Sequence, residues 1–370
     1  MSRGAGRVRI GEPTASDTRP LCSHHGPIIP GEMYCGYACD AAVRDVAASG
    51  GVVTAILLDL LERREIDAAL VSRITGVNGS IRAVSELART REEVLRAAGS
   101  AYVFTPVLKQ VKKLVGFAGR VAIVALPCQA ARIRRLTESH PDLKERIAWV
   151  IGLFCRGAVS EGFYRDFLRR EGLNEADVEQ VRVARRRVTG EVVFGLRGGE
   201  RHHVPFLKMN AYRIAGAHYH FPCLCCAEHL AASADLSVGD IFAPEYKSRP
   251  IRHSALVCRT AGAAELADSL RNRAVIAYEF FGMERYKKTF ARLERFSNTL
   301  GARVAAGKLT GLRVGSGRME AFDPFHAMAW TIVCMNHRLS RTKRGRRFLY
   351  ALPSPIIQGL AMLVKGLARL

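Results

Sequence analysis

Residues 48–71, "ASGGVVTAILLDLLERREIDAALV", contain the pattern that decides the fold class. A turn at Gly50 and Gly51 precedes apolar residues that recur at helical spacing over 52–61, and a short apolar run follows at 68–71. The helical spacing predicts an amphipathic helix, and the uninterrupted run predicts a short buried strand. A glycine turn, a helix and a buried strand in this order are typical of an α/β protein.

The same alternation continues as far as residue 172. "RVAIVAL" (120–126) and "RIAWVIGLF" (146–154) predict further buried strands. "AYVFTPVLKQVKKLV" (101–115), "PCQAARIRRL" (127–136) and "SEGFYRDFLRREG" (160–172) predict helices. Strands that alternate with helices usually form a parallel sheet that is covered on both faces. The predicted fold class is therefore α/β, with a mainly parallel sheet.

The pattern changes after residue 173. Residues 178–204 alternate like a β-hairpin, 206–215 predict a helix, and two short strands are expected at 234–242 and 254–260, before a mostly helical stretch over 261–300. The predicted organisation has four parts. They are a polar head (1–30), an α/β domain (31–172), an α+β domain that carries most of the remaining cysteines (173–300), and a basic helical tail (301–370).

Composition limits the class of protein. Of the 370 residues 48% are hydrophobic, which favours a globular protein over a disordered chain. The 56 basic and 34 acidic residues give a net charge of +22, so anionic partners are expected. The first thirty residues have no apolar run of the kind a secretory signal needs. We therefore expect a cytoplasmic chain, whose ten cysteines are free thiols, metal ligands or catalytic groups and not disulfides.

Four cysteines stand out by position. Cys128 and Cys155 each follow a predicted strand, and the carboxyl ends of parallel strands share one edge of a sheet. Cys223 and Cys226 form a C-x-x-C pair, with Cys225 between them expected to point away. Together the four thiolates are the number that completes a tetrahedral zinc site or a [4Fe-4S] cluster. The alternative for a single cysteine after a strand is an ordinary core residue.

Several segments also resemble a known family, the coenzyme F-420 hydrogenase/dehydrogenase beta-subunit family. They are "YCGYACDAAVRDVAASGGVVTAIL" (34–57), "GSAYVFTPVL" (99–108), "ALPCQAARIRRL" (125–136), "GLFCRGAVS" (152–160), "FPCLCCAEHLAASADLSVGDIF" (221–242) and "HSALVCRTAGAAELAD" (253–268). The resemblance runs in order from about residue 26 to 300. It implies an FAD and iron-sulfur oxidoreductase that passes electrons between a one-electron donor, such as a ferredoxin, and a two-electron carrier or unsaturated substrate. Coenzyme F-420 is that partner in some members and a chlorophyll pigment in others.

The resemblance also implies site residues. It assigns the cluster to the same four cysteines, Cys128, Cys155, Cys223 and Cys226. The residues it implies for flavin binding are Ser49, Gly50, Gly51, Gly99, Ser100, Tyr102 and Gln129. The Gly-Gly turn can act as a phosphate cradle, because glycines let backbone N–H groups approach an anion at the start of a helix.

Two substitutions distinguish this chain from the usual family pattern. Ala101 replaces the lysine of the usual G-S-K-Y segment, and Arg156 replaces the histidine of the more frequent C-H-G. These changes weaken the assignment of F-420 as the substrate. Near the start of the chain, Cys22, Cys35 and Cys39 do not have ferredoxin spacing. A separate protein is therefore expected to deliver electrons, while a zinc or third-cluster role for these three cysteines remains the alternative.

The tail combines a basic run at 338–347 with an apolar helix at 354–370. That helix would extend roughly 25 Å, short of a hydrocarbon core of about 30 Å. It is expected either to attach to the anionic inner face of a membrane or to dock on the protein itself or a partner subunit. Two rival functions remain: an electron-transfer subunit of a hetero- or homo-oligomer without a substrate of its own, and a zinc-stabilised nucleic-acid-binding protein. Since no nucleic-acid-reading motif is present, no nucleic-acid partner is expected.

Overall fold

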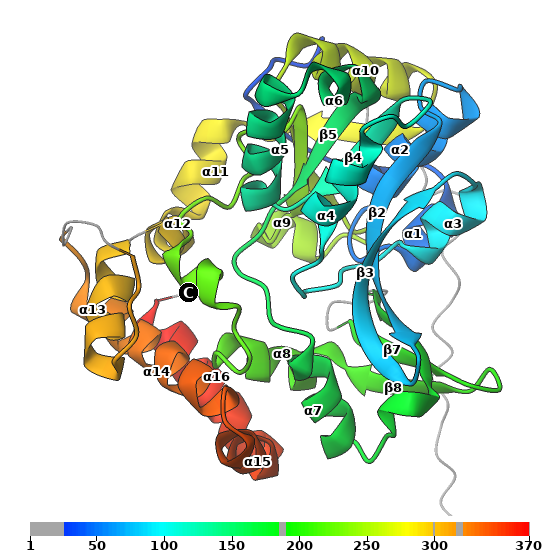
Figure 1. Cartoon of the computed structure of the whole chain (residues 1–370). Helices are drawn as coiled ribbons and strands as arrows, with labels where there is room; N and C mark the ends of the chain where they lie inside the picture. The colour runs from blue at the N-terminus through cyan, green and yellow to red at the C-terminus, as the bar shows by residue number, and fades with distance from the viewer. Residues whose placement is uncertain (1–25, 185–189, 299, 316–320, 370) are drawn as a thin grey trace, which may run out of the picture.

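The computed structural model describes residues 26–184, 190–298, 300–315 and 321–369, and it has one large mixed sheet with helices on both faces (Figure 1). Most of the predicted polar head, including Cys22, lies outside these residues. The strands are β1 (Met33–Ala38), β2 (Ala68–Val77), β3 (Ser80–Ala88), β4 (Val121–Ala125), β5 (Ile147–Leu153), β6 (Val178–Ala184), β7 (Glu191–Leu196), β8 (Arg201–Pro205), β9 (Leu236–Asp240), β10 (Ser254–Cys258) and β11 (Ile276–Phe280).

The helices lie between and after these strands. Before the cysteine loop, residues 221–226, they are α1 (Ala41–Val46), α2 (Val52–Glu62), α3 (Arg91–Arg96), α4 (Val107–Val111), α5 (Pro127–Ser139), α6 (Pro141–Arg146), α7 (Gly162–Arg170) and α8 (Phe206–Ile214). Beyond it they are α9 (Pro244–Lys247), α10 (Ala261–Asn272), α11 (Met283–Thr289), α12 (Ala291–Asn298), α13 (Leu300–Thr310), α14 (Pro324–Ser340), α15 (Lys343–Ala351) and α16 (Ser354–Leu367). Short 3-10 turns lie at Lys112–Leu114, Glu175–Asp177 and Phe221–Cys225.

The expectation of a mainly parallel sheet is wrong. The strand order is β11-β1-β10-β9-β5-β4-β2-β6-β7-β8, with β3 on β2. In the described residues only the pairings of β2 with β4, β4 with β5 and β5 with β9 are parallel. The other pairings are antiparallel, because β6 to β8 form a meander at one end and β1 lies between β10 and β11 at the other. The fold is thus a mixed α/β fold with a mostly antiparallel sheet.

Three local predictions also need correction. The segment predicted as a helix over 101–115 is irregular up to Pro106, and α4 begins only after it, since a proline disfavours helical conformation in the residue before it. Strand β3 was not expected, although its turn at Asn78 and Gly79 has positive φ at both residues, as a two-residue hairpin requires. Strand β11 lies within the stretch expected to be mostly helical.

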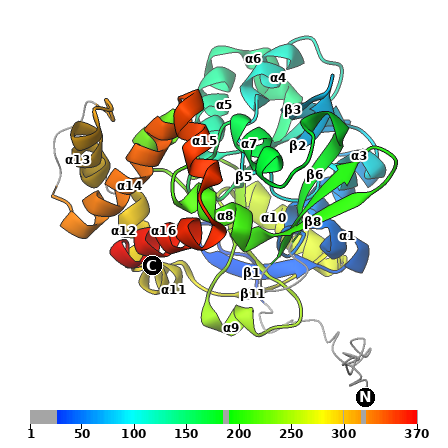
Figure 2. The same cartoon turned by 90° about the horizontal axis from the view of Figure 1, so that it is seen from below.

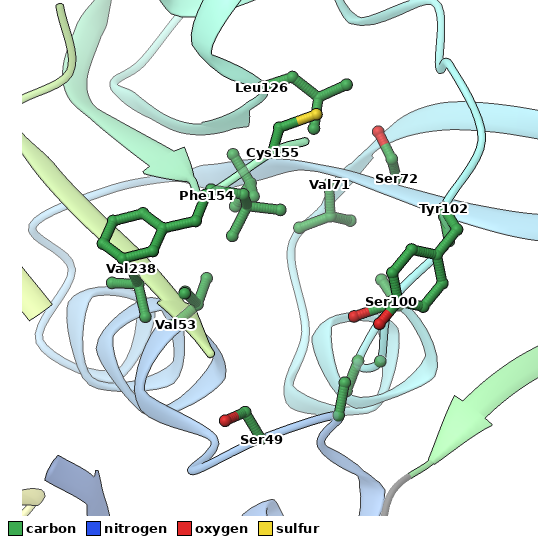
Figure 3. Close-up of a pocket in the computed structure, with 18 of the residues that line it drawn as sticks. Ser49, Val53, Val71, Ser72, Ser100, Tyr102, Leu126, Phe154, Cys155 and Val238 are labelled. Atoms are coloured by element: carbon green, nitrogen blue, oxygen red, sulfur yellow. The ribbon is translucent and has the colours of Figure 1, made fainter. Parts of the chain in front are cut away.

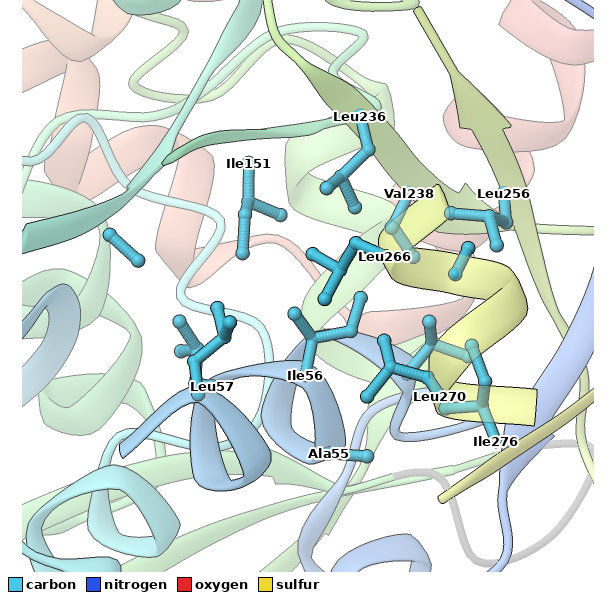
Figure 4. Close-up of a cluster of buried hydrophobic side chains, with 14 of the residues drawn as sticks. Ala55, Ile56, Leu57, Ile151, Leu236, Val238, Leu256, Leu266, Leu270 and Ile276 are labelled. Carbon is cyan, nitrogen blue, oxygen red and sulfur yellow. The ribbon is translucent and has the colours of Figure 1, made fainter. Parts of the chain in front are cut away.

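The two faces of the sheet bury different sets of apolar residues. Successive residues of a strand point to opposite faces, so Ala69 and Val71 face α2 and α10, while Ala68 and Leu70 face α4 and α5. Figure 4 shows side chains of α2 and α10 meeting those of β5, β9 and β10 in the first of these clusters. The strands β9 to β11 come from the predicted domain 173–300 yet extend the sheet of 31–172. The proposed division into domains stays a prediction.

The C-terminal region is helical, as predicted, and α14 to α16 pack on the rest of the protein (Figure 2). Helix α16 contacts α8 and α14 and buries Ile357, Ala361 and Val364, while α15 contacts α7. Within the described residues no single helix is both long and apolar enough to cross a membrane. Helices α15 and α16 meet the length and composition criteria only as a pair, and this pair is bent by 99°.

Candidate functional site

A cavity of about 270 Å³ lies where the parallel strands end (Figure 3). Its walls come from residues that end or follow β4, β5 and β9, among them Leu126, Cys155 and Asp240. Other walls come from the segment before α2 and from residues 97–105. The carboxyl edge of parallel strands is where α/β proteins usually bind ligands, so this cavity is the candidate functional site.

Helix α2 presents its N-terminus to the cavity. Gly51 precedes the helix with a φ of 79°, no side chain caps it, and Val52 to Thr54 line the cavity wall. The first amides of a helix have no partner within the helix, and the helix dipole favours an anion there. A cofactor phosphate therefore fits this end of the cavity.

Gly50, which is also predicted to bind the flavin, has contacts inside the protein. Its N–H donates to the Ser254 hydroxyl oxygen over 3.0 Å, so this amide already has a partner inside the protein. A Cβ at Gly50 would lie 2.6 Å from the carbonyl oxygen of Gly36, which means that glycine is needed for packing against β1. Ser49, which lines the cavity, donates its hydroxyl to the carbonyl of His253 over 2.9 Å.

The opposite wall carries Gly99, Ser100 and Tyr102. Figure 3 shows the side chains of Ser100 and Tyr102 close together at the cavity. Tyr102 has a φ of 53°, a backbone conformation that is strained for a tyrosine and is often found at ligand sites. Its ring packs against Phe206 at 5.4 Å between centroids and lies under the Arg213 guanidinium at 4.7 Å. A rigid aromatic surface with a nearby cation thus closes this side.

Gln129 also lines the cavity, but both ends of its amide are used inside the protein. Its Oε1 accepts from the Leu126 N–H over 2.9 Å, and its Nε2 donates to the Thr105 carbonyl over 2.8 Å. The side chain is almost fully buried and fastens the start of α5 to the segment before α4. Its contribution to the cavity is to hold that wall in place.

The four cysteines predicted as ligands lie near one another beside this cavity. Burial, followed by the charges of Cys155 and Cys226, raises the pKa of Cys128 to about 11. Burial and, to a smaller extent, the charges of the other three thiols raise the pKa of Cys223 to about 12. Thiols influence each other's pKa only at short range, so all four converge on one region. Within the described ranges, no three His, Cys, Asp or Glu side chains lie close enough together to hold one metal ion.

Arg303, which sequence reasoning missed, organises the cysteine loop. Its guanidinium donates to the carbonyl oxygens of Cys223, Cys226 and Ser297 and lies 4.4 Å from the centre of the Trp330 ring. Only 3% of this residue is exposed. A buried guanidinium that satisfies several carbonyls fixes the backbone around it. No signal points to Arg303 in the sequence, because it is a lone arginine beyond the family-like segments.

Arg156 and the remaining cysteines singled out in the sequence lie in different environments. Arg156 lies beside Cys155, but its guanidinium is 3.6 Å from the Glu294 carboxylate and donates to the Ser297 hydroxyl, so its charge is paired. Cys225 is exposed. Cys35, in β1, is buried in the apolar core, and burial raises its pKa to about 12; Cys39 is exposed. Cys35 is therefore placed as a core thiol.

The fold and the cavity define a mixed α/β protein with a cysteine-rich site at the carboxyl edge of its parallel strands. The chain belongs to the coenzyme F420 hydrogenase/dehydrogenase beta-subunit family. Residues 33–112 match the model for the N-terminal region of the coenzyme F420 hydrogenase/dehydrogenase beta subunit, and residues 118–281 match the model for its C-terminal region. This confirms the family that the sequence segments resemble.

Similar proteins include subunits of methanogen enzymes. The chain is 30% identical over 210 residues to a subunit of the F(420)H(2) dehydrogenase of Methanosarcina mazei, and the match covers 55% of this chain and 56% of that protein. It is 26% identical over 279 residues to the beta subunit of the coenzyme F420 hydrogenase of Methanothermobacter thermautotrophicus, and this match covers 72% of this chain and 89% of that protein. The chain thus spans about half the length of the first relative and most of the second.

A solved structure has a similar fold. It is a chain in the F420-reducing [NiFe] hydrogenase complex from Methanosarcina barkeri, with a TM-score of 0.57 and 18% identity, covering 78% of this chain and 96% of that chain. At this identity the similarity concerns the fold alone.

Proposed function

We propose that this protein is an FAD- and [4Fe-4S]-dependent oxidoreductase that passes electrons between a one-electron donor protein and a two-electron carrier of the F-420 type. The observation that carries the proposal is Cys155, which lines the α2 cavity and also belongs to the group of four interacting thiols. One side chain therefore joins the predicted flavin cavity to the predicted cluster site.

The chemistry of the residues supports both groups: a helix N-terminus suits the flavin phosphates, and four thiols suit a cluster. When bound, a flavin accepts two electrons together and releases them singly, while an iron-sulfur cluster carries one electron at a time. The N-terminus of α2 would bind the cofactor phosphates, and Tyr102 with Arg213 would border its ring system. The walls of this cavity also include the apolar side chains of Val71 and Val238.

The four cysteines would hold the cluster, and hydrogen bonds from Ala158 and Arg303 hold the loop that carries two of them. The Ala158 N–H donates to the Cys223 sulfur over 3.4 Å, a bond that lowers the pKa of that thiol against the effect of burial. Arg303 holds the carbonyls of Cys223 and Cys226 in place and brings a positive charge near both. The loop is thus positioned before any ligand binds.

The test is iron content in serine variants that are purified without oxygen. Replacing Cys128, Cys155, Cys223 or Cys226 by serine is expected to reduce iron from about four atoms per chain to below about one, since a hard alkoxide replaces a soft thiolate. The matched control is Cys225→Ser in the same loop, which should keep its iron. Full iron in Cys128→Ser or Cys155→Ser would contradict the four-ligand arrangement, and iron loss in Cys225→Ser would mean that a different thiol of the trio is a ligand.

The second candidate function is an electron-transfer subunit that has no substrate of its own. It is favoured by the relatives, which are named as subunits of larger enzymes. The two functions are separated by mixing the purified chain with reduced F-420 and an artificial one-electron acceptor. Turnover by the isolated chain supports the oxidoreductase, and turnover only after a partner is added supports the electron-transfer subunit.

A further inference from the structure

A second and larger cavity, of about 990 Å³, borders the start of the cysteine loop. Three segments form its walls: 160–169, 218–221 and 337–347. Helices α7 and α15, which carry many of these residues, contact each other and lie side by side in Figure 2. Six of its fifteen lining residues are basic and one is acidic. The basic residues are Arg165, Arg169, Arg341, Lys343, Arg346 and Arg347.

The single carboxylate in the wall, Asp166, is already fully bonded. Its Oδ1 accepts from Arg169 over 2.8 Å, and its Oδ2 accepts from His218 Nε2 over 2.8 Å and lies 3.2 Å from Arg346 Nε. Burial alone would raise the pKa of Asp166, but the hydrogen bond from His218 and the charges of His218, Arg346 and Arg169 hold it below its ordinary value. Asp166 therefore cannot compensate the other cations of the cavity.

Three of those cations have no acidic partner in the part of the chain that the structure describes. They are Arg341, Lys343 and Arg347, and all three are exposed at the rim. Like charges that share a concave wall repel one another and raise the local concentration of anions. Guanidinium groups also match phosphate oxygens with paired hydrogen bonds. The rim is therefore suited to a compact anion with several oxygens.

An unsatisfied histidine lies in the inner wall of the same cavity. Nδ1 of His337 is 2.7 Å from the carbonyl oxygen of Tyr219, which can only accept, so this nitrogen carries the proton. His337 is only 6% exposed, and its Nε2 has no hydrogen-bond partner. A buried polar atom without a partner is unfavourable unless a ligand or water satisfies it. This atom is a second, independent sign of a ligand.

We propose that this cavity binds a small ligand that carries at least one phosphate group, with Arg341, Lys343 and Arg347 around the phosphate and Nε2 of His337 accepting a hydrogen bond from a protonated oxygen of that phosphate. The basic wall at 337–347 lies outside both regions that match the family models. The residues proposed to hold the phosphate therefore belong to the C-terminal helices, while the other two walls, 160–169 and 218–221, lie within the family-matched region. The proposal does not depend on the redox function.

The test is calorimetric titration of the full-length protein, purified with its cofactors, with inorganic pyrophosphate. Arg347→Gln and Arg344→Gln are compared because both residues are exposed on α15 and only Arg347 lines the cavity. The two variants have the same net charge, so general attraction of anions is equal in both. We expect Arg347→Gln to weaken binding at least about tenfold, since a charge-assisted bond is lost, and Arg344→Gln to change it less than about twofold.

His337 supplies a second pair of variants. In His337→Asn the amide can still donate to the Tyr219 carbonyl, but no atom remains at the position of Nε2. We expect this variant to keep its fold and to bind pyrophosphate several-fold more weakly. In His337→Gln the amide reaches the position of Nε2, and binding should be restored in part.

A vesicle arm separates the two sources of phosphate. Sedimentation with phosphatidic acid vesicles is compared with phosphatidylcholine vesicles for the same variants. If pyrophosphate binds Arg347→Gln more weakly than Arg344→Gln, the ligand is a soluble phosphate compound. If only phosphatidic acid vesicles show this difference between the two variants, the ligand is a lipid headgroup. Equal effects of Arg347→Gln and Arg344→Gln, or no binding to either probe, would overturn the proposal.

Discussion

Gly157→Ala tests how the cysteine loop is positioned. Gly157 follows Cys155 and Arg156 and has a φ of 115°. A Cβ there would overlap the hydroxyl oxygen of Tyr219 and lie 2.8 Å from its Cε2. The Tyr219 ring cannot move away easily, because its hydroxyl donates to the Arg156 carbonyl over 3.0 Å and its ring packs against Trp330.

The expected loss of stability has two parts. The positive φ costs an alanine about 1–2 kcal/mol, and forcing an extra methyl group into a packed site costs about 1–3 kcal/mol more. We therefore expect Gly157→Ala to lower the free energy of unfolding by about 2–5 kcal/mol, measured by urea denaturation without oxygen. Gly116→Ala is the matched control, since Gly116 has a φ of 77° and no atom within 4 Å of its Cβ position. It should lose only the conformational part, about 1–2 kcal/mol.

Equal losses in the two variants would refute the reasoning, because the contact with Tyr219 would then contribute nothing. Iron content provides an independent measurement. The Tyr219 hydroxyl donates to the carbonyl of Arg156, which is next to Cys155, and Tyr219 lies just before the cysteine loop. Displacement of the Tyr219 ring should therefore also reduce the iron content of Gly157→Ala. Gly116→Ala should retain its iron.

Two further predictions concern the C-terminal helices and the second cavity. If α16 attaches to anionic membranes, Met362→Glu and Leu363→Glu should abolish sedimentation with anionic vesicles and leave the circular dichroism spectrum unchanged, because these side chains are 65% and 51% exposed. Ile357→Glu, on the buried face of α16, should unfold the helix. Retained sedimentation of the first two variants would exclude the exposed face of α16 as the membrane-binding surface. Because the pKa of Asp166 is lowered in the folded state, its contribution to stability is present above about pH 4 and is lost as pH falls through the folded pKa. The difference in unfolding free energy between wild type and Asp166→Asn should therefore stay constant from about pH 5 to 7 and shrink below about pH 4, and a constant difference down to about pH 2 would contradict the assigned partners.

Much of the local structure can be predicted from the sequence, but the sheet cannot. Helix α2 and strands β4 and β5 have strong local periodicity and occur where it indicates. An alternation of helices and strands predicts parallel pairing only where a helix connects the two strands. In this protein such connections link β2 to β4 and β4 to β5. The pairing of β1 with β10 and β11 joins segments more than 200 residues apart, and no local pattern encodes it.

For the candidate site too, some features can be predicted from the sequence and others cannot. The proximity of Cys128 and Cys155 follows from their places after adjacent parallel strands, which is a local signal. The role of Gly50 could not be inferred, because a Gly-Gly turn looks the same whether its amide meets a phosphate or the hydroxyl of Ser254. Arg303 and His337 lie on helices beyond the family-like segments, where one basic side chain among many gives no indication of burial.

The position of β1 has a consequence for how the protein is made. This strand leaves the ribosome early, yet both strands that pair with it, β10 and β11, are synthesised more than 200 residues later. The cavity likewise needs Ser49 from the start of the chain and Ser254 from far beyond it. During synthesis β1 therefore remains an unpaired apolar segment, a state that favours aggregation and binding by chaperones. Cofactors that occupy the cavity would have to be inserted late, after the segment that carries β10 and β11 has emerged.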